Sequence, residues 1–203
     1  MQSNTSATLF VAGILLLGCG DAGRRNPGSD TDPPGTVRDN ADASPTAGDV
    51  TAPVRNAAGK ELGNLTLTEA GGGIALAGRL TGLPPGQHAI HLHATGRCDP
   101  SAGSGQAPPS FESAGDHWNP TNTAHGTGSS KGPHLGDLPN ITVARDSSVT
   151  VQATTPGGTL RGQNGLLDAD GASVVVHAKR DDNRSQPAGD SGDRIACGVV
   201  GGR

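Results

Sequence analysis

The stretch that decides the fold and the chemistry of this chain is His88-Ala89-Ile90-His91-Leu92-His93. Its alternation of polar and apolar residues predicts a β-strand, because successive side chains of a strand point to opposite faces. His91 and His93 then share one face, with Cβ atoms roughly 6.5–7 Å apart, and Ile90 and Leu92 share the other. Two imidazoles at this spacing suit one metal ion held above a sheet. His88 falls on the apolar face, which argues against a ligand role.

The composition favours short strands and turns over helices. The chain has 203 residues, with 33 glycines, 15 prolines, no tyrosine and 1% aromatic residues. No long stretch shows helical periodicity, so the core must be built from Val, Leu, Ile and Ala on strands. The net charge of −4 comes without a basic block, which argues against nucleic acid as a partner.

The N-terminal segment has the character of an export signal. Residues 8–18 form an apolar run that is too short to span a bilayer comfortably but fits the hydrophobic part of a signal peptide. Leu16-Leu17-Gly18-Cys19 resembles a bacterial lipoprotein signal, whose cysteine is acylated after cleavage, although no Lys or Arg precedes the run. A plain signal peptide or a disordered start are the alternatives. We predict a lipoprotein-type signal peptide at 1–18, lipidation of Cys19, and a membrane-anchored protein of the cell envelope (periplasm).

Two further regions follow the signal. Residues 19–50 are rich in Gly, Asp, Pro, Ser, Thr and Asn and carry almost no large apolar side chain, which predicts a disordered tether. Residues 51–203 are predicted to form one β domain. Its short apolar segments, separated by Gly, Pro and Asn, predict an all-β antiparallel sandwich or barrel. The expected strands lie at residues 50–56, 62–68, 74–80, 88–93, 141–144, 149–153, 174–177 and 194–200.

Two long polar loops interrupt this pattern, at residues 94–140 and 178–193. A loop this long inside a compact domain is functional or argues against the strand assignment. The first loop and the strand ends beside both loops hold six of the seven histidines, which favours metal binding over scattered solvent-facing side chains. Imidazoles suit copper and zinc, and a carboxylate among imidazoles favours zinc. Besides His91 and His93, the candidate ligands are His117, His125, His134, Asp137 and His177.

The motifs together resemble the copper/zinc superoxide dismutase family, bacterial periplasmic or lipoprotein type. The resemblance covers about residues 51–203, and the motifs occur in the same order as in the family. They are His91-Leu92-His93, Gly115-Asp116-His117-Trp118-Asn119-Pro120, His125-Gly126, His134-Leu135-Gly136-Asp137-Leu138, Val175-Val176-His177-Ala178-Lys179 and Arg194-Ile195-Ala196-Cys197-Gly198-Val199-Val200.

The resemblance implies a Greek-key β-sandwich or flattened barrel and one copper and one zinc ion per subunit. Copper would be bound by His91, His93, His117 and His177. Zinc would be bound by His117, His125, His134 and Asp137, so that His117 bridges the two metals.

The resemblance also implies roles for residues outside the metal ligands. Asp181 would link ligands of the two metals, and Arg194 would dock superoxide near copper. Arg194 and His117 would be the catalytic residues of a superoxide dismutase that makes oxygen and hydrogen peroxide and protects the cell envelope from superoxide. If Cys19 carries lipid, Cys98 and Cys197 remain as a pair, and the resemblance implies a disulfide between them.

One departure from the family pattern concerns the second loop. Some members carry a Thr opposite the arginine, at the rim of the substrate channel. Residues 178–193 contain no Thr, and their hydroxyl-bearing residues are Ser185 and Ser191, so the rim of the channel departs from the family pattern. A copper-binding or copper-delivery domain without turnover is the main alternative function, and a surface interaction module with a structural zinc loop is another. The predicted partners are superoxide, a membrane through Cys19, and a second copy of the chain in a candidate homodimer.

Overall fold

The structure is a computed structural model that describes residues 48–100 and 110–201. The chain divides into two units, Met1–Arg38 and Asp39–Arg203, and every described residue belongs to the second. The predicted signal peptide at 1–18, Cys19 and the tether up to residue 47 lie outside the described residues. In the part that the structure describes, no helix is both long and apolar enough to cross a bilayer.

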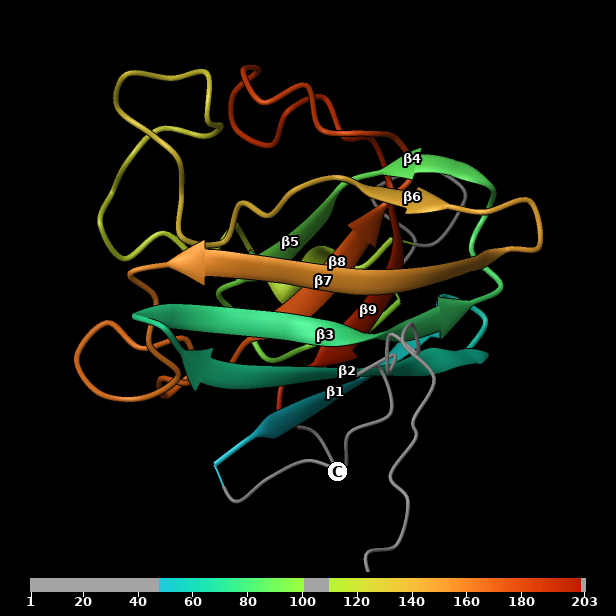
Figure 1. Ribbon diagram of the computed structural model, residues 1–203, viewed down its shortest axis with the longest axis horizontal. Coiled ribbons are helices and arrows are strands. Elements are labelled where there is room, and N and C mark those ends of the chain that lie inside the picture. Colours follow the sequence, from blue (N-terminus) through green and yellow to red (C-terminus); the bar gives the residue numbers. More distant parts are fainter. Residues whose placement is uncertain (1–47, 101–109, 202–203) are drawn as a thin grey trace, which may run out of the picture. The chain divides into compact units, whose positions relative to one another are not determined.

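The described residues form an all-β domain, which confirms the predicted fold class. They contain nine strands and one short 3-10 helix, η2 (Glu112–Ala114) (Figure 1). The strands are β1 (Val50–Asn56), β2 (Glu61–Ala70), β3 (Gly73–Thr81), β4 (Gly86–His88), β5 (Ile90–His93), β6 (Ile141–Val143), β7 (Ser148–Pro156), β8 (Ser173–His177) and β9 (Arg194–Val199).

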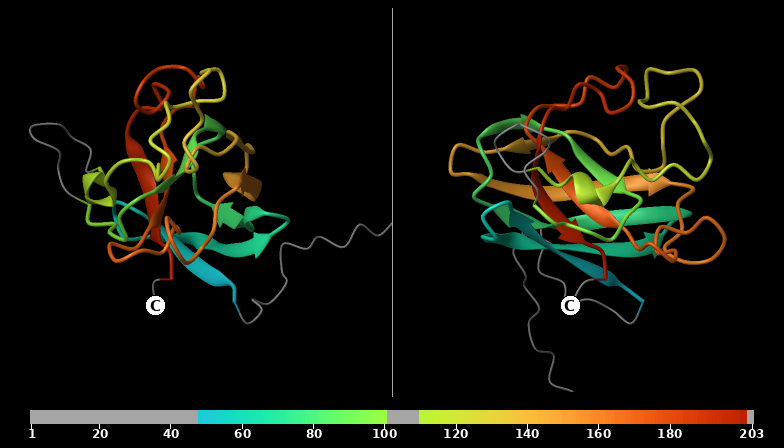
Figure 2. Two further views of the ribbon diagram at one scale, coloured as in Figure 1. Left: turned by 90° about the vertical axis from the view of Figure 1, so that its left-hand side faces the viewer. Right: turned by 180° about the vertical axis from the view of Figure 1, so that it is seen from behind.

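Seven strands form one curled antiparallel sheet in the order β5-β8-β9-β1-β2-β3-β7, and β4 pairs with β6 in a small second sheet (Figure 2). After β3 the chain crosses to β4 and β5 and later returns through β6 to β7, which pairs with β3. Because β4 leads into β5 at one margin and β6 leads into β7 at the other, the small sheet connects the two margins. The result is a flattened half-barrel.

The strand expected over residues 88–93 is divided at Ala89. β4 pairs with β6, whereas β5 pairs with β8. The Ala89 N–H donates to Lys179 O (2.8 Å), and its carbonyl accepts from His177 N–H (2.9 Å), so Ala89 bonds with residues that follow β8 or end it. Alternation along a sequence does not show which partner each half of a strand chooses, so the single-strand prediction was wrong at this point.

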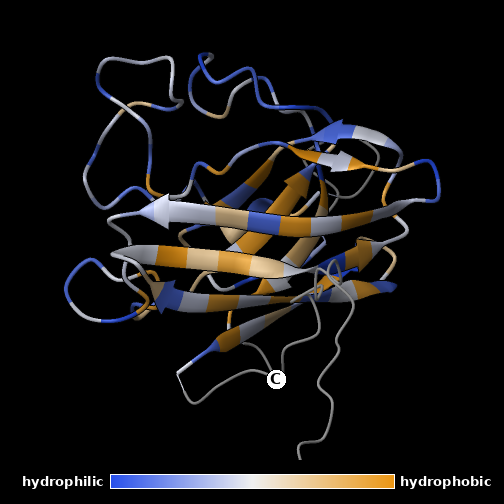
Figure 3. Cartoon of the chain, in the orientation of Figure 1, coloured by the Kyte–Doolittle hydropathy of each residue, from blue (hydrophilic) through white to orange (hydrophobic). Residues whose placement is uncertain are grey.

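The two faces of β5 and β8 have different neighbours. Ile90, Leu92, Val174 and Val176 point into the main apolar core, together with the buried residues of β1, β2, β3 and β7. The alternation is visible along the strands in Figure 3. The opposite face holds the histidines and a small second apolar cluster, formed by Phe111, Ala114, Val175 and Cys197. At β5 and β8, one face of the sheet therefore packs into the apolar core, and the long loops lie on the other face.

Candidate metal centre

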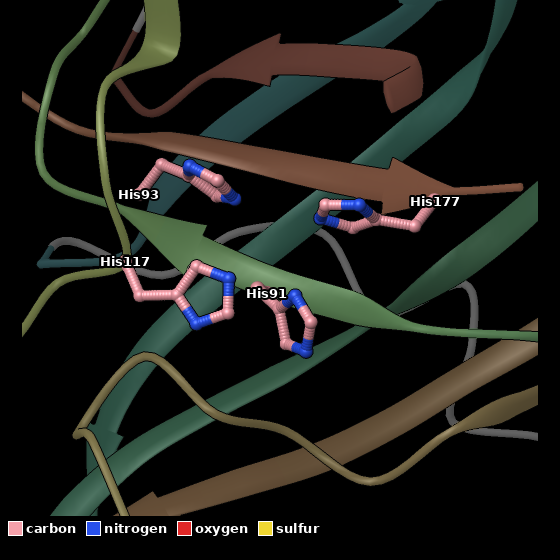
Figure 4. A group of neighbouring side chains, drawn as sticks. All are labelled: His91, His93, His117 and His177. Carbon is pink, nitrogen blue, oxygen red and sulfur yellow. The ribbon is translucent and has the colours of Figure 1, made fainter. Parts of the chain in front are cut away.

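Two neighbouring strands place three histidines on one face of the sheet. In the β5–β8 pair, His91 lies opposite Val175 and His93 lies opposite Ser173. Residues opposite each other share a face, and so do residues two apart, so His177 at the end of β8 projects on the same side as His91 and His93. Figure 4 shows these three rings and the ring of His117 gathered over the strands.

The first loop reaches the site by binding to the free edge of β5. The Leu92 N–H donates to Gly136 O (2.9 Å), and the Leu92 carbonyl accepts from Trp118 N–H (2.8 Å). Gly136 must be a glycine for this approach, because a Cβ there would lie 2.3 Å from Leu92 O. These backbone contacts set His117 and Asp137, the neighbours of Trp118 and Gly136, beside the histidines of β5.

The first cluster consists of His91, His93, His117 and His177, all buried, with ligand atoms within 4.8 Å of one another. One ring nitrogen of each is buried without a hydrogen-bond partner, namely His91 Nδ1, His93 Nε2, His117 Nε2 and His177 Nε2, and no other buried side-chain nitrogen or oxygen of the described residues is in this state. Buried polar atoms are rarely left unpaired, so four convergent ones indicate a ligand set. An all-imidazole site of this kind fits copper.

The opposite ring nitrogens have partners that fix the ring orientations. His91 Nε2 lies 2.9 Å from Asp181 Oδ2, His93 Nδ1 lies 2.9 Å from Gly115 O, and His177 Nδ1 lies 3.1 Å from Gly192 O. A carboxylate or carbonyl oxygen only accepts, so each of these nitrogens carries the proton. The lone pairs of the unpartnered nitrogens are therefore free to bind a metal ion.

Burial also keeps these imidazoles uncharged. Removal from water lowers the pKa of His91 to about 4, against the opposing effect of Asp181, and lowers the pKa of His177 to about 3. Burial and the neighbouring His117 bring the pKa of His93 well below its usual range. Only the neutral ring is a metal ligand, so these three rings are in the binding form at neutral pH.

The second cluster consists of His117, His125, His134 and Asp137. Asp137 Oδ1 lies 2.8 Å from His117 Nδ1, 3.0 Å from His125 Nδ1 and 3.3 Å from His134 Nδ1. Four ligands placed tetrahedrally at zinc-ligand distances of about 2.0–2.1 Å lie about 3.3 Å from one another. The cluster therefore matches the size and the donor set of a closed zinc site.

Asp137 is oriented by the backbone of the loop that carries the zinc ligands. Its Oδ2 accepts from Gly126 N–H (2.8 Å) and from His134 N–H (3.0 Å), which leaves Oδ1 for the cluster. Burial opposes the charged form of Asp137, but hydrogen bonds from His117 and His125 outweigh it and lower the pKa of this carboxyl. Burial likewise opposes charge on His125, while Asp137 and Asp181 raise its pKa to about 9.

Asp181 contacts one histidine of each cluster. Its Oδ2 lies 2.9 Å from His91 Nε2 and its Oδ1 lies 3.0 Å from His125 Nε2. Asn140 holds it in place, because the Asp181 N–H donates to Asn140 Oδ1 (2.7 Å) and Asn140 Nδ2 donates to Asp181 O (2.9 Å). One buried carboxylate thus fixes one ring of each cluster.

Arg194 lies beside the first cluster because of strand register. It opens β9 directly opposite His177, and with His177 it lines a hollow of about 520 Å³ walled by the second loop. Its Nη1 donates to Phe111 O (2.9 Å), and its Nη2 lies 3.9 Å from Glu112 Oε2. The Arg194 side chain is 15% exposed, and its contacts with Phe111 and Glu112 hold the guanidinium in a defined position.

The Cys98–Cys197 disulfide is present, with Cα atoms 5.6 Å apart. Cys197 packs with Phe111, and Cys98 packs against the same small cluster. The bridge therefore ties the start of the first loop to β9, next to the carbonyl that holds Arg194.

This arrangement can be compared with known proteins. A family model described as copper/zinc superoxide dismutase (SODC) matches residues 61–200, which is more than half of the chain. The chain belongs to the copper/zinc superoxide dismutase family. Membership confirms the resemblance drawn from the motifs.

Several relatives in the family are bacterial. A copper-zinc superoxide dismutase of Caulobacter vibrioides is 44% identical over 154 residues, which cover 74% of this chain and 84% of that protein. The structure of a copper/zinc superoxide dismutase from Brucella abortus matches with a TM-score of 0.61 and 31% identity, covering 74% of this chain and 98% of that one. A SOD-like protein from Bacillus subtilis matches with a TM-score of 0.66 and 33% identity, over 73% and 96% of the two chains.

Sequence reasoning missed several residues that support this superoxide dismutase site. Asn140 holds Asp181, as described above. Gln186 joins the two loops, since His125 N–H donates to Gln186 Oε1 (2.9 Å) and Gln186 Nε2 donates to His125 O (3.0 Å). Gly189 lies so near Asp181 that a Cβ would be 1.8 Å from Asp181 Oδ1. None of these residues has a local pattern that distinguishes it from other loop residues.

Proposed function

We propose that this protein catalyses the dismutation of superoxide to oxygen and hydrogen peroxide, with one copper and one zinc ion bound. His91, His93, His117 and His177 would hold copper, and His117, His125, His134 and Asp137 would hold zinc. The observation that carries the proposal is the convergence of four unpartnered imidazole nitrogens next to Arg194, in a member of this family. Arg194 gives an anionic substrate a place to dock.

Copper supplies the one-electron redox change that dismutation requires, whereas zinc keeps one oxidation state. The other contributions come from the chain itself. His117 has one ring nitrogen in each cluster, so its Nε2 is the atom that can hold a proton next to the substrate while Nδ1 stays with the zinc ligands. Asp181 keeps His91 and His125 in fixed orientations, and the zinc ligands keep His117 in place.

Metal analysis and a superoxide-consumption assay test this function. We expect the protein, loaded with both metals, to contain one copper and one zinc per chain and to consume superoxide much faster than buffer with the same metals. A fully metallated protein that gives no acceleration would contradict the enzyme and favour the alternative of a copper-binding or copper-delivery domain.

Arg194 is expected to control the capture of substrate and not the binding of metal. Arg194→Ala should lower kcat/KM by about 10- to 100-fold, within the range that electrostatic attraction contributes to encounter rates. Arg194→Lys should retain more activity because it keeps the charge but loses the fork of paired donors. Arg194→Glu should be the slowest variant because it repels the anion. Steady-state kinetics at low salt on variants with verified copper and zinc content measures this order.

Salt provides the control for the Arg194 series. Rising ionic strength should slow the parent protein, because charges farther apart than about 8–10 Å are screened at physiological salt. The slope should be smaller in Arg194→Ala. Equal rates for the parent and all three variants at low salt would show that Arg194 does not guide superoxide.

We infer further that the protein is exported and held at a membrane of the cell envelope through lipid on Cys19, with residues 19–50 as a tether to the domain at 51–203. The apolar run at residues 8–18, the position of Cys19 directly after it, and the Cys98–Cys197 disulfide support this proposal. A mature protein that begins at Cys19 and enters the detergent phase would agree with it. A different first residue and an aqueous protein would contradict it, and size-exclusion chromatography of the same sample tests the homodimer.

A further inference from the structure

A buried serine of the second loop contacts a ligand of the first cluster. Ser191 is 2% exposed, and its Oγ lies 3.1 Å from Nδ1 of His177. The loop backbone holds this residue on both sides. Its carbonyl accepts from Lys179 N–H (2.9 Å), and its N–H donates to Ala188 O (3.3 Å). These two backbone hydrogen bonds fix the position of Ser191, and so keep its hydroxyl next to His177.

The direction of this hydrogen bond follows from a third group. Gly192 O also lies 3.1 Å from His177 Nδ1, and a carbonyl oxygen can only accept. His177 Nδ1 must therefore carry the proton and share it between Gly192 O and Ser191 Oγ. The other ring nitrogen, Nε2, is left with its lone pair toward the first cluster, where it has no partner.

We propose that Ser191 is a positioning residue that fixes the orientation of His177 and raises the electron-donor strength of its Nε2, so that the site favours copper(II) over copper(I). The inference rests on the copper role proposed for the first cluster. An acceptor on the distal N–H increases the basicity of a ligating imidazole. Copper(II) binds more strongly than copper(I) to a more basic imidazole nitrogen. Ser191 Oγ, as a second acceptor beside Gly192 O, therefore stabilises the copper(II) state more than the copper(I) state.

Ser191→Ala removes only this acceptor. The matched control is Ser185→Ala, an exposed serine of the same loop whose hydroxyl contacts Asp182. Ser191→Thr keeps a hydroxyl at the position. For Ser191→Ala we expect copper(II) affinity to fall by about tenfold, at the lower end of the effect of losing such a partner, because Gly192 O remains. With copper(I) affinity unchanged, the reduction potential rises by about 59 mV for this one-electron couple.

A second measurement avoids copper altogether. In the protein loaded with zinc alone, the ring N–H proton of His177 should exchange with water faster in Ser191→Ala than in the parent, with zinc content unchanged. Proton NMR in water, with His177→Gln to assign the signal, measures this. Ser185→Ala and Ser191→Thr should both behave as the parent does in exchange, affinity and potential.

Three results would overturn the proposal. The first is a parent-like affinity, potential and exchange rate in Ser191→Ala. The second is the same change in Ser185→Ala, which would show a general effect on the loop. The third is a Ser191→Thr variant that changes as much as Ser191→Ala, which would exclude the hydroxyl as the cause. Because none of these measurements uses turnover, a failure of the proposed dismutase activity would be seen separately in the parent protein.

Discussion

Replacing His177 with alanine is expected to abolish superoxide dismutation while the protein keeps its zinc. His177 contributes one of the four unpartnered nitrogens of the first cluster and belongs to no other cluster. Loss of a partner that only orients a ligand costs about 10- to 100-fold in metal affinity, and loss of the ligand itself should exceed this. Copper titration and superoxide consumption, with zinc measured in the same samples, check the prediction.

His134→Ala is the matched control, because His134 belongs only to the second cluster. This variant should lose zinc affinity while His91, His93 and His177 still bind copper. The two variants together should separate the two metals. If His177→Ala kept parental copper affinity and activity, the assignment of the first cluster to copper would be wrong.

Removing the disulfide, as Cys98→Ala with Cys197→Ala, should have the largest effect on stability. The bridge joins residues 99 positions apart. In the chain-entropy model, losing a disulfide that closes a loop of this length lowers the free energy of unfolding by about 4–5 kcal/mol. For a domain of this size the melting temperature should fall by roughly 10–20 °C, which calorimetry on the metal-loaded protein measures.

Activity should fall together with stability in the double variant. Phe111 packs against Cys197, and the carbonyl of Phe111 holds Arg194, so a looser loop gives a less ordered guanidinium. The reduced parent protein should behave as the double variant does. A double variant that melts at the parental temperature with parental kcat/KM would show that the bridge neither stabilises the domain nor supports Arg194.

The sequence determined those features that depend on neighbours along the chain. Alternation places His91 and His93 opposite Ile90 and Leu92, and a strand has only two faces, so burial of the apolar pair was predictable. The same reasoning located the strands that the structure describes to within a few residues, except that it merged β4 and β5 into one strand. The copper and zinc assignments came from motif resemblance, because no local rule brings His117 and Asp137 from separate parts of a long loop to the same edge of β5.

Only the tertiary structure decided which groups meet across the two loops. Asp181 contacts His91, 90 positions earlier, and Gln186 contacts His125, 61 positions earlier. A polar side chain in a loop can form hydrogen bonds with many different groups. Which of these groups it meets depends on how β5, β8 and β9 pair and pack. Ala89 shows that sequence alone does not give strand partners either, because β4 before it pairs with β6 and β5 after it pairs with β8. Ser191 shows it most clearly: in the sequence it is one of two serines in a polar loop, and only the fold buries its hydroxyl against His177.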